Sequence, residues 1–347
     1  MKKKSSNKNL HKASKEKKDE FYTQLSDIEK ELKHYKDQFR GKVVFCNCDD
    51  PKESNFVKYF SMNFEHLGLK KLIATHYKEA SLFTQEQPYK LEYTGDKNGN
   101  RIPDPEEFIT EMIGTGDFRS DECIDLLKEA DIVVTNPPFS LFREYVAQLR
   151  EYDKKFLIIG NTNSMTYKEI FKLFKEDRIR TGYTNFNVGM FFIVPEDWEK
   201  FHHIDESGNK IARVSTSCWF TNLEVDKHKE NITLYKKYKS EEYPKYENYN
   251  AINVNKYTDI PYDYGGDMGV PITFLDKYNP KQFEIIGLGI SNSGIEIGVK
   301  RYKEEHKKYR KEIQKRGAVD GDLYMIVNGI VNVTYARIII KNKKVKK

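Results

Sequence analysis

The chain has 347 residues, of which 38% are hydrophobic and 13% aromatic, so it can form a core and is not wholly disordered. No stretch approaches the roughly 18 consecutive apolar residues of a membrane-spanning helix, and no apolar segment typical of a secretory signal follows the charged N-terminus. Four scattered cysteines are too few for a disulfide framework. We therefore expect a reduced, cytoplasmic protein that does not associate with membranes.

The positive charge is concentrated at the two ends of the chain. Residues 1–18 carry 8 Lys and 1 Glu, and residues 341–347 carry 5 Lys and no acid. Residues 19–340 hold 46 basic and 52 acidic residues, a net charge of −6. We predict a disordered basic tail at 1–18 and a second basic tail at 341–347. If the acidic body binds nucleic acid, it must do so through local positive patches.

The first 75 residues predict the beginning of an α/β domain. Apolar residues with helical spacing run from Phe21 to Phe39, and a short apolar strand follows at 42–46. A helix from Phe56 to about residue 67 and another apolar strand at 71–75 complete a β-α-β unit. This pattern is typical of a parallel sheet with helices on both faces.

Residues 78–115 are predicted to be an insertion that contains a β-hairpin. The strand Tyr89–Tyr93 is followed by a turn at Asn98-Gly99 and a second strand at Arg101-Ile102.

Alternating strands and helices continue to about residue 222. The predicted strands cover residues 131–135, 156–159, 187–194 and 214–220. Beyond this point eight tyrosines lie between Tyr235 and Tyr264, mixed with Lys, Asn and Pro, and short apolar runs separated by Gly and Asn follow. We predict an α/β domain over 19–222 and a smaller, mostly β or irregular domain over 223–340.

The tetrapeptide Asn136-Pro137-Pro138-Phe139 directly follows a predicted buried strand. Ligands of open α/β sheets bind beyond the carboxyl ends of the strands. The two prolines lack N–H donors, which leaves carbonyl oxygens and the Asn136 amide as acceptors for an exocyclic amino group. Holding both amino protons draws the nitrogen lone pair out of conjugation, and Phe139 offers a face on which the ring can stack. The alternative interpretation is an ordinary turn at the end of a strand.

Asn-Pro-Pro-Phe after a strand resembles the catalytic motif of S-adenosylmethionine-dependent amino-methyltransferases of nucleobases. Three further blocks narrow the resemblance to the EcoRI-type adenine-specific DNA methyltransferases, over about residues 40–340. These blocks are Asp49-Asp50-Pro51 with Ser54-Asn55-Phe56, Ser140-Leu141-Phe142 after the tetrapeptide, and Pro271–Leu275 with Tyr278-Asn279-Pro280 and Phe283–Ile286.

The resemblance implies a Rossmann-like methyltransferase sheet with a smaller C-terminal domain that recognises the DNA target. It assigns catalysis to Asn136, Pro137, Pro138 and Phe139. It places S-adenosylmethionine at the tips of the first strands, with binding residues Cys48, Asp49, Asp50, Pro51, Asn55, Asp117 and Phe118. In the family pattern a glycine-rich loop follows Asp-Pro, whereas this chain has Lys52-Glu53-Ser54-Asn55. An alternative role for Asp117 is to cap the helix that follows.

The resemblance implies methyl transfer to N6 of a flipped-out adenine in double-stranded DNA, by a monomer that belongs to a restriction-modification system. The paired endonuclease would not contact it directly. No His or Cys pair has the spacing of a metal site, so no metal is expected. Two alternatives remain open from the residues: methylation of RNA or of a protein amide nitrogen, and a catalytically silent DNA-binding relative.

Overall fold

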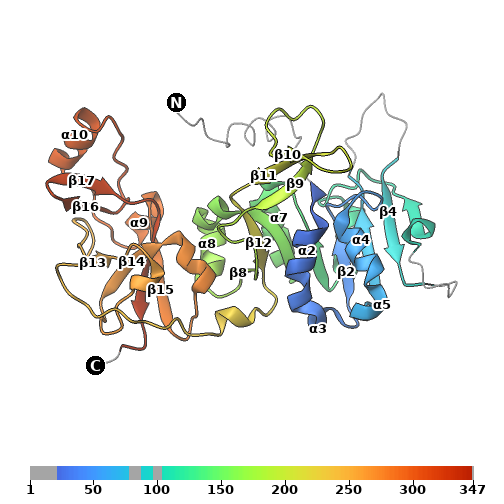
Figure 1. Cartoon of the computed structure of the whole chain (residues 1–347), viewed down its shortest axis with the longest axis horizontal. Coiled ribbons are helices and arrows are strands. Elements are labelled where there is room, and N and C mark those ends of the chain that lie inside the picture. The colour runs from blue at the N-terminus through green and yellow to red at the C-terminus, as the bar shows by residue number, and fades with distance from the viewer. Residues whose placement is uncertain (1–21, 78–86, 97–103, 346–347) are drawn as a thin grey trace. The chain divides into compact units, whose positions relative to one another are not determined.

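The computed structural model describes residues 22–77, 87–96 and 104–345. The tail predicted at 1–18, and the turn and second hairpin strand predicted at 98–102, lie outside these ranges. The chain divides into two compact units (Figure 1). The first comprises residues 1–164 and 181–224, and the second comprises residues 165–180 and 225–347.

The centre of the first unit is a mixed sheet with the strand order β5-β4-β3-β2-β6-β7-β12-β8. Its strands, in chain order, are β2 (Val43–Cys46), β3 (Lys71–Thr75), β4 (Tyr89–Tyr93), β5 (Ile109–Glu111), β6 (Ile132–Thr135), β7 (Lys155–Asn161), β8 (Arg180–Thr181) and β12 (Ser217–Thr221). The inner strands β3, β2, β6 and β7 are parallel, whereas β4 runs antiparallel to β3 and β5, and β12 runs antiparallel to β7. This arrangement confirms the predicted α/β class.

The inner strands form because each contains an uninterrupted run of three or more apolar residues. Every residue of β2 and of β6 is buried, as expected for parallel strands that are covered on both faces. Helices α4 (Asn55–Met62) and α5 (Phe64–Leu67) connect β2 to β3, and α7 (Phe142–Glu151) connects β6 to β7. These connections lead away from the centre in opposite directions. Since such crossovers are right-handed, they place their helices on opposite faces of the sheet.

Helix α2 (Leu25–Leu32), the short 3-10 turn at 33–35 and α3 (Lys36–Phe39) form the predicted N-terminal stripe. Of its apolar residues, Ile28, Leu32, Tyr35 and Phe39 are fully buried, Leu25 is partly buried, and Phe21 lies outside the described residues. Helix α2 packs beside α4, on the side of the sheet that faces the viewer in Figure 1. Helix α6 (Asp121–Glu129) packs against β2, and Ser120 caps it by accepting a hydrogen bond from the Cys123 N–H group.

A second, smaller sheet of this unit has the order β1-β9-β11-β10. Its strands are β1 (Tyr22–Thr23), β9 (Met190–Val194), β10 (His203–Ile204) and β11 (Lys210–Val214). The single strand predicted at 214–220 is therefore wrong, because Val214 ends β11 whereas Ser217–Phe220 belong to β12, and these two strands lie in different sheets. Strand β4 pairs with β5 in an antiparallel arrangement, whereas the second hairpin strand predicted at 101–102 lies outside the described residues and stays a prediction.

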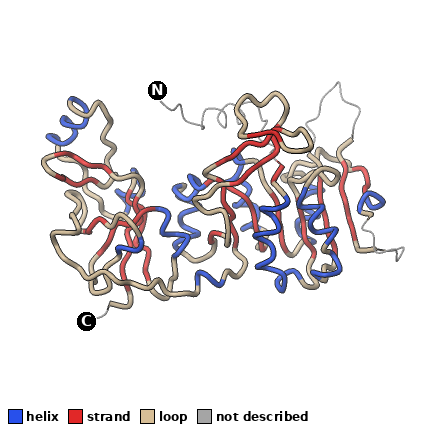
Figure 2. The backbone as a smooth tube through the Cα atoms, viewed as in Figure 1, coloured by secondary structure: helices blue, strands red, loops and turns tan. Residues whose placement is uncertain are grey.

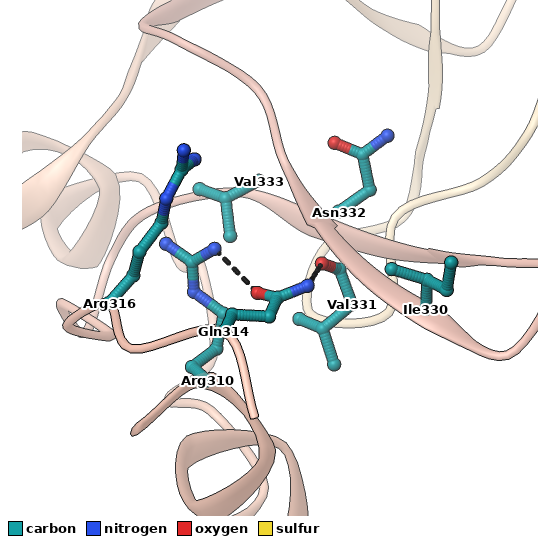
Figure 3. Close-up of a pocket in the computed structure, with 7 residues that line it drawn as sticks. All are labelled: Arg310, Gln314, Arg316, Ile330, Val331, Asn332 and Val333. Carbon is teal, nitrogen blue, oxygen red and sulfur yellow. Dashed lines mark hydrogen bonds between the residues drawn. The ribbon is translucent and has the colours of Figure 1, made fainter. Parts of the chain in front are cut away.

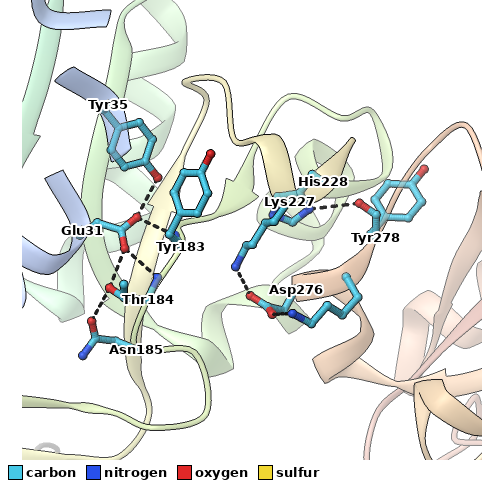
Figure 4. Close-up of polar contacts among 10 residues, drawn as sticks. Glu31, Tyr35, Tyr183, Thr184, Asn185, Lys227, His228, Asp276 and Tyr278 are labelled. Atoms are coloured by element: carbon cyan, nitrogen blue, oxygen red, sulfur yellow. Dashed lines mark hydrogen bonds and ion pairs between the residues drawn. The ribbon is translucent and has the colours of Figure 1, made fainter. Parts of the chain in front are cut away.

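A buried carboxylate fastens the loop that precedes β9 (Figure 4). Glu31 is fully buried on α2. Its oxygens accept hydrogen bonds from the Tyr35 hydroxyl at 2.7 Å, from the backbone N–H groups of Tyr183 and Thr184 at 2.7 Å each, and from the Thr184 hydroxyl at 2.6 Å. Because four donors share two oxygens, this carboxylate fixes the position of the loop.

The second unit contains a four-stranded sheet with the order β13-β14-β18-β15. Its elements are α8 (Lys168–Lys175), β13 (Ala251–Asn253), β14 (Asp267–Pro271), β15 (Phe283–Gly289), α9 (Ser291–Glu296), α10 (Glu304–Glu312), the hairpin strands β16 (Tyr324–Val327) and β17 (Ile330–Val333), and β18 (Arg337–Asn342). Figure 2 shows how much of this unit is loop. Within it Lys227 pairs with Asp276 at 2.6 Å, and His228 contacts the Tyr278 carbonyl oxygen at 3.1 Å (Figure 4).

Two features differ from the predicted domain boundaries. Residues 165–180, including α8, group with the second unit although they lie within the segment 19–222. Strand β18 continues to Asn342, so it includes the first two residues of the segment predicted as a basic tail. No helix in the described ranges has the length and the hydropathy needed to cross a membrane.

Candidate active site

Two of the predicted site segments, Cys48-Asp49 and the Asn136 tetrapeptide, meet where β2 and β6 end side by side. These strands are parallel neighbours, paired at Val44 with Ile132 and at Phe45 with Val133. From β2 the chain continues to β3 on one side, whereas from β6 it continues to β7 on the opposite side. The carboxyl ends of β2 and β6 therefore form a topological switch point, the place where open α/β sheets bind ligands.

Asp49, three residues beyond β2, is bound directly to the end of β6. It is 7% exposed. Its Oδ1 accepts a hydrogen bond from the Ser54 hydroxyl at 2.8 Å, and its Oδ2 accepts one from the Thr135 hydroxyl. Burial raises the pKa of Asp49 to about 6, although the bonds from Thr135, Ser54 and the Asn136 backbone act in the opposite direction. Asp49 thus connects the first strand to the Asn136 tetrapeptide.

Cys48 and Asn47 reinforce the same connection. The Cys48 N–H group donates to the Thr135 hydroxyl at 3.2 Å, and burial raises the pKa of the Cys48 thiol. The Tyr145 hydroxyl, on α7, donates to the Asn47 side-chain oxygen. The Thr75 hydroxyl at the end of β3 donates to the Asn47 carbonyl at 3.2 Å. Polar contacts thus join the ends of β3, β2 and β6.

Asp50 faces a different set of partners, on the β3 and β4 side. It accepts hydrogen bonds from the Tyr89 hydroxyl at 2.7 Å and from the Lys52 N–H group at 2.8 Å, and it lies 3.5 Å from His76 Nε2. The rings of His76 and Tyr89 stack with centroids 4.6 Å apart, and the Lys52 ammonium lies 4.5 Å from the centre of the Tyr89 ring. A carboxylate and two stacked rings thus lie beside the carboxyl end of β2, on the side of β3 and β4.

The Asp117-Phe118 pair lies next to this edge. A Cβ atom on Gly116 would lie 2.0 Å from the His76 carbonyl oxygen, so the loop before Asp117 passes directly against the end of β3. Arg119 donates to both Asp117 oxygens, at 2.8 and 2.7 Å. Phe118 is 4% exposed, and its ring meets that of Tyr145 edge-on at 5.1 Å. Asp117 is therefore partly neutralised by its neighbour, and Phe118 belongs to the core.

The tetrapeptide leaves β6 and leads into a 3-10 turn at 139–141 that precedes α7. The Pro138 carbonyl accepts a hydrogen bond from the Leu141 N–H group at 3.0 Å. No hydrogen bond within the described part of the chain reaches the Pro137 carbonyl oxygen. The half-buried Phe139 ring meets Phe192 of β9 edge-on, with centroids 6.4 Å apart.

The remaining predicted cofactor residues, Pro51 and Asn55, lie where the loop after β2 turns into α4. Pro51 is buried. The Asn55 side chain donates to the Thr23 carbonyl oxygen at 2.8 Å, so it holds β1 against the start of the helix. Ser54, in the segment that replaces glycines, caps α4 by accepting from the Phe56 N–H group at 3.0 Å.

Sequence reasoning missed the residues that hold this site together. Thr135 ends an apolar strand, Tyr145 lies on an amphipathic helix, and Tyr89 lies on an insertion. Each is polar at a position whose neighbours predict burial, which is the one signal that could have found them. That signal does not identify their hydrogen-bond partners, which lie 39 to 98 positions away in the chain. Within the described residues no group of three or more His, Cys, Asp or Glu side chains could hold a metal ion.

Comparison with known proteins identifies the family of the chain. Residues 9–343 match the family described as adenine-specific methyltransferase EcoRI. The chain is 48% identical to the Type II methyltransferase M.EcoRI of Escherichia coli, over the whole of both chains. It is 40% identical to the Type II methyltransferase M.MpnI of Mycoplasma pneumoniae, over 80% of this chain and 84% of the relative. M.MgeORF184P of Mycoplasma genitalium is 39% identical over 80% and 85%, respectively.

No solved structure matches the chain. The match to the family covers nearly the full length, and it includes both the Asp49–Asn55 block and the Asn136 tetrapeptide. The predicted resemblance is therefore confirmed: the chain belongs to the adenine-specific EcoRI methyltransferase family.

Proposed function

We propose that this protein transfers a methyl group from S-adenosylmethionine to N6 of an adenine within a specific sequence of double-stranded DNA. One observation carries the proposal. The Asn136 tetrapeptide leaves β6 beside the end of β2, where Asp49 is bonded to Thr135 and to the Asn136 backbone. An acceptor set for an amine thus lies next to the carboxylates of the first strand.

Asn136 and Pro137 would bind the two protons of the adenine amino group. The amide oxygen of Asn136 is one acceptor, and the Pro137 carbonyl, which the described residues leave without a hydrogen-bond donor, is the other. Two such bonds favour a tetrahedral nitrogen whose lone pair points away from the ring system. The nitrogen then becomes nucleophilic without prior deprotonation, and the surplus proton leaves after transfer.

Phe139 would hold the base itself. Its ring is partly exposed and is supported edge-on by Phe192. An adenine inside a duplex cannot reach the end of β6, so the base must leave the helix and stack in the site. The protein supplies chiefly position and local electrostatics.

The side chains around the first strand fit the methyl donor in chemical type. Asp50 is a carboxylate near the end of β2, suited to an ammonium or a ribose hydroxyl, and the stacked His76 and Tyr89 rings lie against it. Bound there, S-adenosylmethionine would supply an activated methyl group. Asp117 would reach the adenine amino group of the cofactor while it remains paired with Arg119. These features support a Rossmann-like methyltransferase sheet as the scaffold.

The second unit would recognise the DNA target, and the enzyme would act as a monomer in the cytoplasm, as the modification partner of a restriction endonuclease. Support comes from the Type II relatives and from the many tyrosines and lysines between residues 235 and 264, which suit phosphate and base contacts.

The decisive experiment separates catalysis from cofactor binding. Asn136→Ala should abolish methyl transfer to duplex DNA, whereas calorimetry should show unchanged affinity for S-adenosylmethionine. Asn209→Ala, in an exposed turn of the same unit, is the matched control and should remain active. Full activity of Asn136→Ala would overturn the mechanism, and preferential methylation of RNA by the unmodified protein would overturn the substrate.

A further inference from the structure

The second unit contains a concentrated positive segment in an otherwise acidic body. Residues 300–316 hold nine Lys or Arg residues and three Glu residues, a net charge of +6. Since residues 19–340 together carry −6, the rest of the body carries −12. The segment comprises the four residues before α10, the helix itself and the turn after it. A local positive patch of this kind is what an acidic body needs in order to bind a polyanion.

This segment is held firmly against the β16–β17 hairpin. The Tyr302 and Tyr324 rings stack at 4.2 Å, and His306 Nδ1 lies 3.0 Å from the Tyr324 hydroxyl. Just after the C-terminal end of α10, Gln314 Nε2 donates a hydrogen bond to the Val331 carbonyl oxygen of β17 at 2.8 Å. The basic side chains therefore project from a fixed framework, which lowers the entropy cost of binding.

A cavity of about 390 Å³ lies between the end of this segment and β17 (Figure 3). Arg310 and Arg316 line it on one side, and the hairpin residues Ile330–Val333 line it on the other. Arg310 donates to the Gln314 side-chain oxygen at 2.8 Å and to the Gly317 carbonyl at 3.1 and 3.3 Å, so its guanidinium is held in place. Two guanidinium groups at one cavity form a suitable binding site for an anionic oxygen.

Several of the neighbouring cations have no acidic partner. Lys308, Lys311, Lys315 and Arg316 are exposed, and no ion pair with any of them occurs within residues 22–77, 87–96 and 104–345. By contrast, Lys307 of the same helix lies between Glu304 at 3.4 Å and Asp320 at 3.3 Å. The described part of the protein therefore does not neutralise the charges of these four exposed side chains: Lys308, Lys311, Lys315 and Arg316.

We propose that the basic face, defined as Lys308, Lys311, Lys315, Arg316 and the adjoining cavity, binds the phosphate backbone of duplex DNA. The inference rests on the proposed function and assigns one contact surface to the second unit. Its chemistry is that of backbone rather than base recognition, because cationic donors predominate on it. Contact at this face would fix the orientation of the duplex while other residues of the unit read the bases.

The experiment measures DNA affinity as a function of salt concentration in the full-length protein. The triple variant K308Q/K311Q/K315Q is compared with K58Q/K128Q/K229Q, which removes the same charge from exposed lysines elsewhere. The salt slope, log Kd against log salt, should fall by roughly 0.9 for each phosphate that is no longer neutralised, or about 2 to 3 in the first variant. The slope of the control should fall much less. Arg316→Gln should weaken binding more than Arg316→Lys.

Backbone contact predicts an equal loss of affinity for target and non-target duplexes. An unchanged salt slope in the triple variant, or a loss confined to the target sequence, would overturn the assignment. Binding of S-adenosylmethionine and methyl transfer at saturating DNA are measured in the same preparations. If the unmodified protein methylates DNA and the variant binds it normally, this inference fails alone. If the unmodified protein neither binds nor methylates DNA, the proposed function fails.

Discussion

Thr135 connects the end of β6 to the loop that follows β2, and replacing it with valine tests that connection. Its side chain is fully buried. Its hydroxyl donates to Asp49 and accepts the Cys48 N–H group at 3.2 Å. Valine has nearly the same shape but no hydroxyl group. The substitution Thr135→Val therefore removes two hydrogen bonds with little change in packing.

The expected loss of stability follows from these two bonds. A buried N–H group left without an acceptor costs roughly 1–3 kcal/mol, and a hydrogen bond to a charged group contributes roughly 1.5–3 kcal/mol. Thr135→Val should therefore lower the free energy of unfolding by about 3 kcal/mol or more. Thr135→Ser keeps the hydroxyl group and loses one buried methyl group, which costs about 1 kcal/mol.

Urea unfolding at pH 8 measures the difference. Trp219, buried in the first unit, is a fluorescence probe of this region. The midpoint for Thr135→Val should lie well below that for Thr135→Ser. Equal midpoints for the two variants would show that the hydroxyl group does not hold the strands together, and would refute the reasoning from hydrogen bonds.

Three further substitutions test other parts of the first unit. Burial raises the pKa of Asp49 from 3.8 to about 6. Protonated Asp49 therefore stabilises the fold below pH 4, and roughly 3 kcal/mol of the free energy of unfolding is lost as the pH rises through 6. In Asp49→Asn the urea midpoint should not show this decline with pH. Gly116→Ala places a Cβ atom 2.0 Å from the His76 carbonyl oxygen, whereas the Cβ atom of Gly208→Ala, also at positive φ, meets nothing within 4 Å. Gly116→Ala should therefore lose clearly more thermal stability than Gly208→Ala. Equal losses would argue against the close approach of the Gly116 loop to the end of β3. Glu31→Gln turns one acceptor of a four-donor site into a donor and should cost roughly 2–4 kcal/mol in urea unfolding, whereas a loss below about 1 kcal/mol would contradict the network.

The inner strands could be predicted from the sequence because their signal is local. Residues 42–46, 71–75, 131–135 and 156–159 are short apolar runs that end at polar or turn-forming residues, and each corresponds to a parallel strand. The β11–β12 region could not be resolved in this way. Its two strands are joined by Ser215-Thr216, a turn without Gly or Pro, and their assignment to different sheets depends on contacts far away in the chain.

The site shows the same division between local and distant information. The Asn136–Phe139 tetrapeptide could be found because its residue types and its position after a strand are both read from adjacent residues in the sequence. The network around it depends on Asn47 with Tyr145 and on Asp50 with Tyr89, which are 98 and 39 residues apart. The spatial meeting of these pairs is decided by sheet order and crossover geometry. The resemblance to a family supplied roles for Asp49 and Asp117, but not their hydrogen-bond partners.

The central claim is that the Asn136 tetrapeptide presents an adenine amino group to a methyl donor. The most direct measurement is to express the protein in a host that lacks adenine methylation and to map modified bases across its DNA. The unmodified protein should produce N6-methyladenine in one short sequence, and Asn136→Ala expressed at the same level should produce none. Equal methylation in both strains, or no modified adenine in either, would contradict the claim.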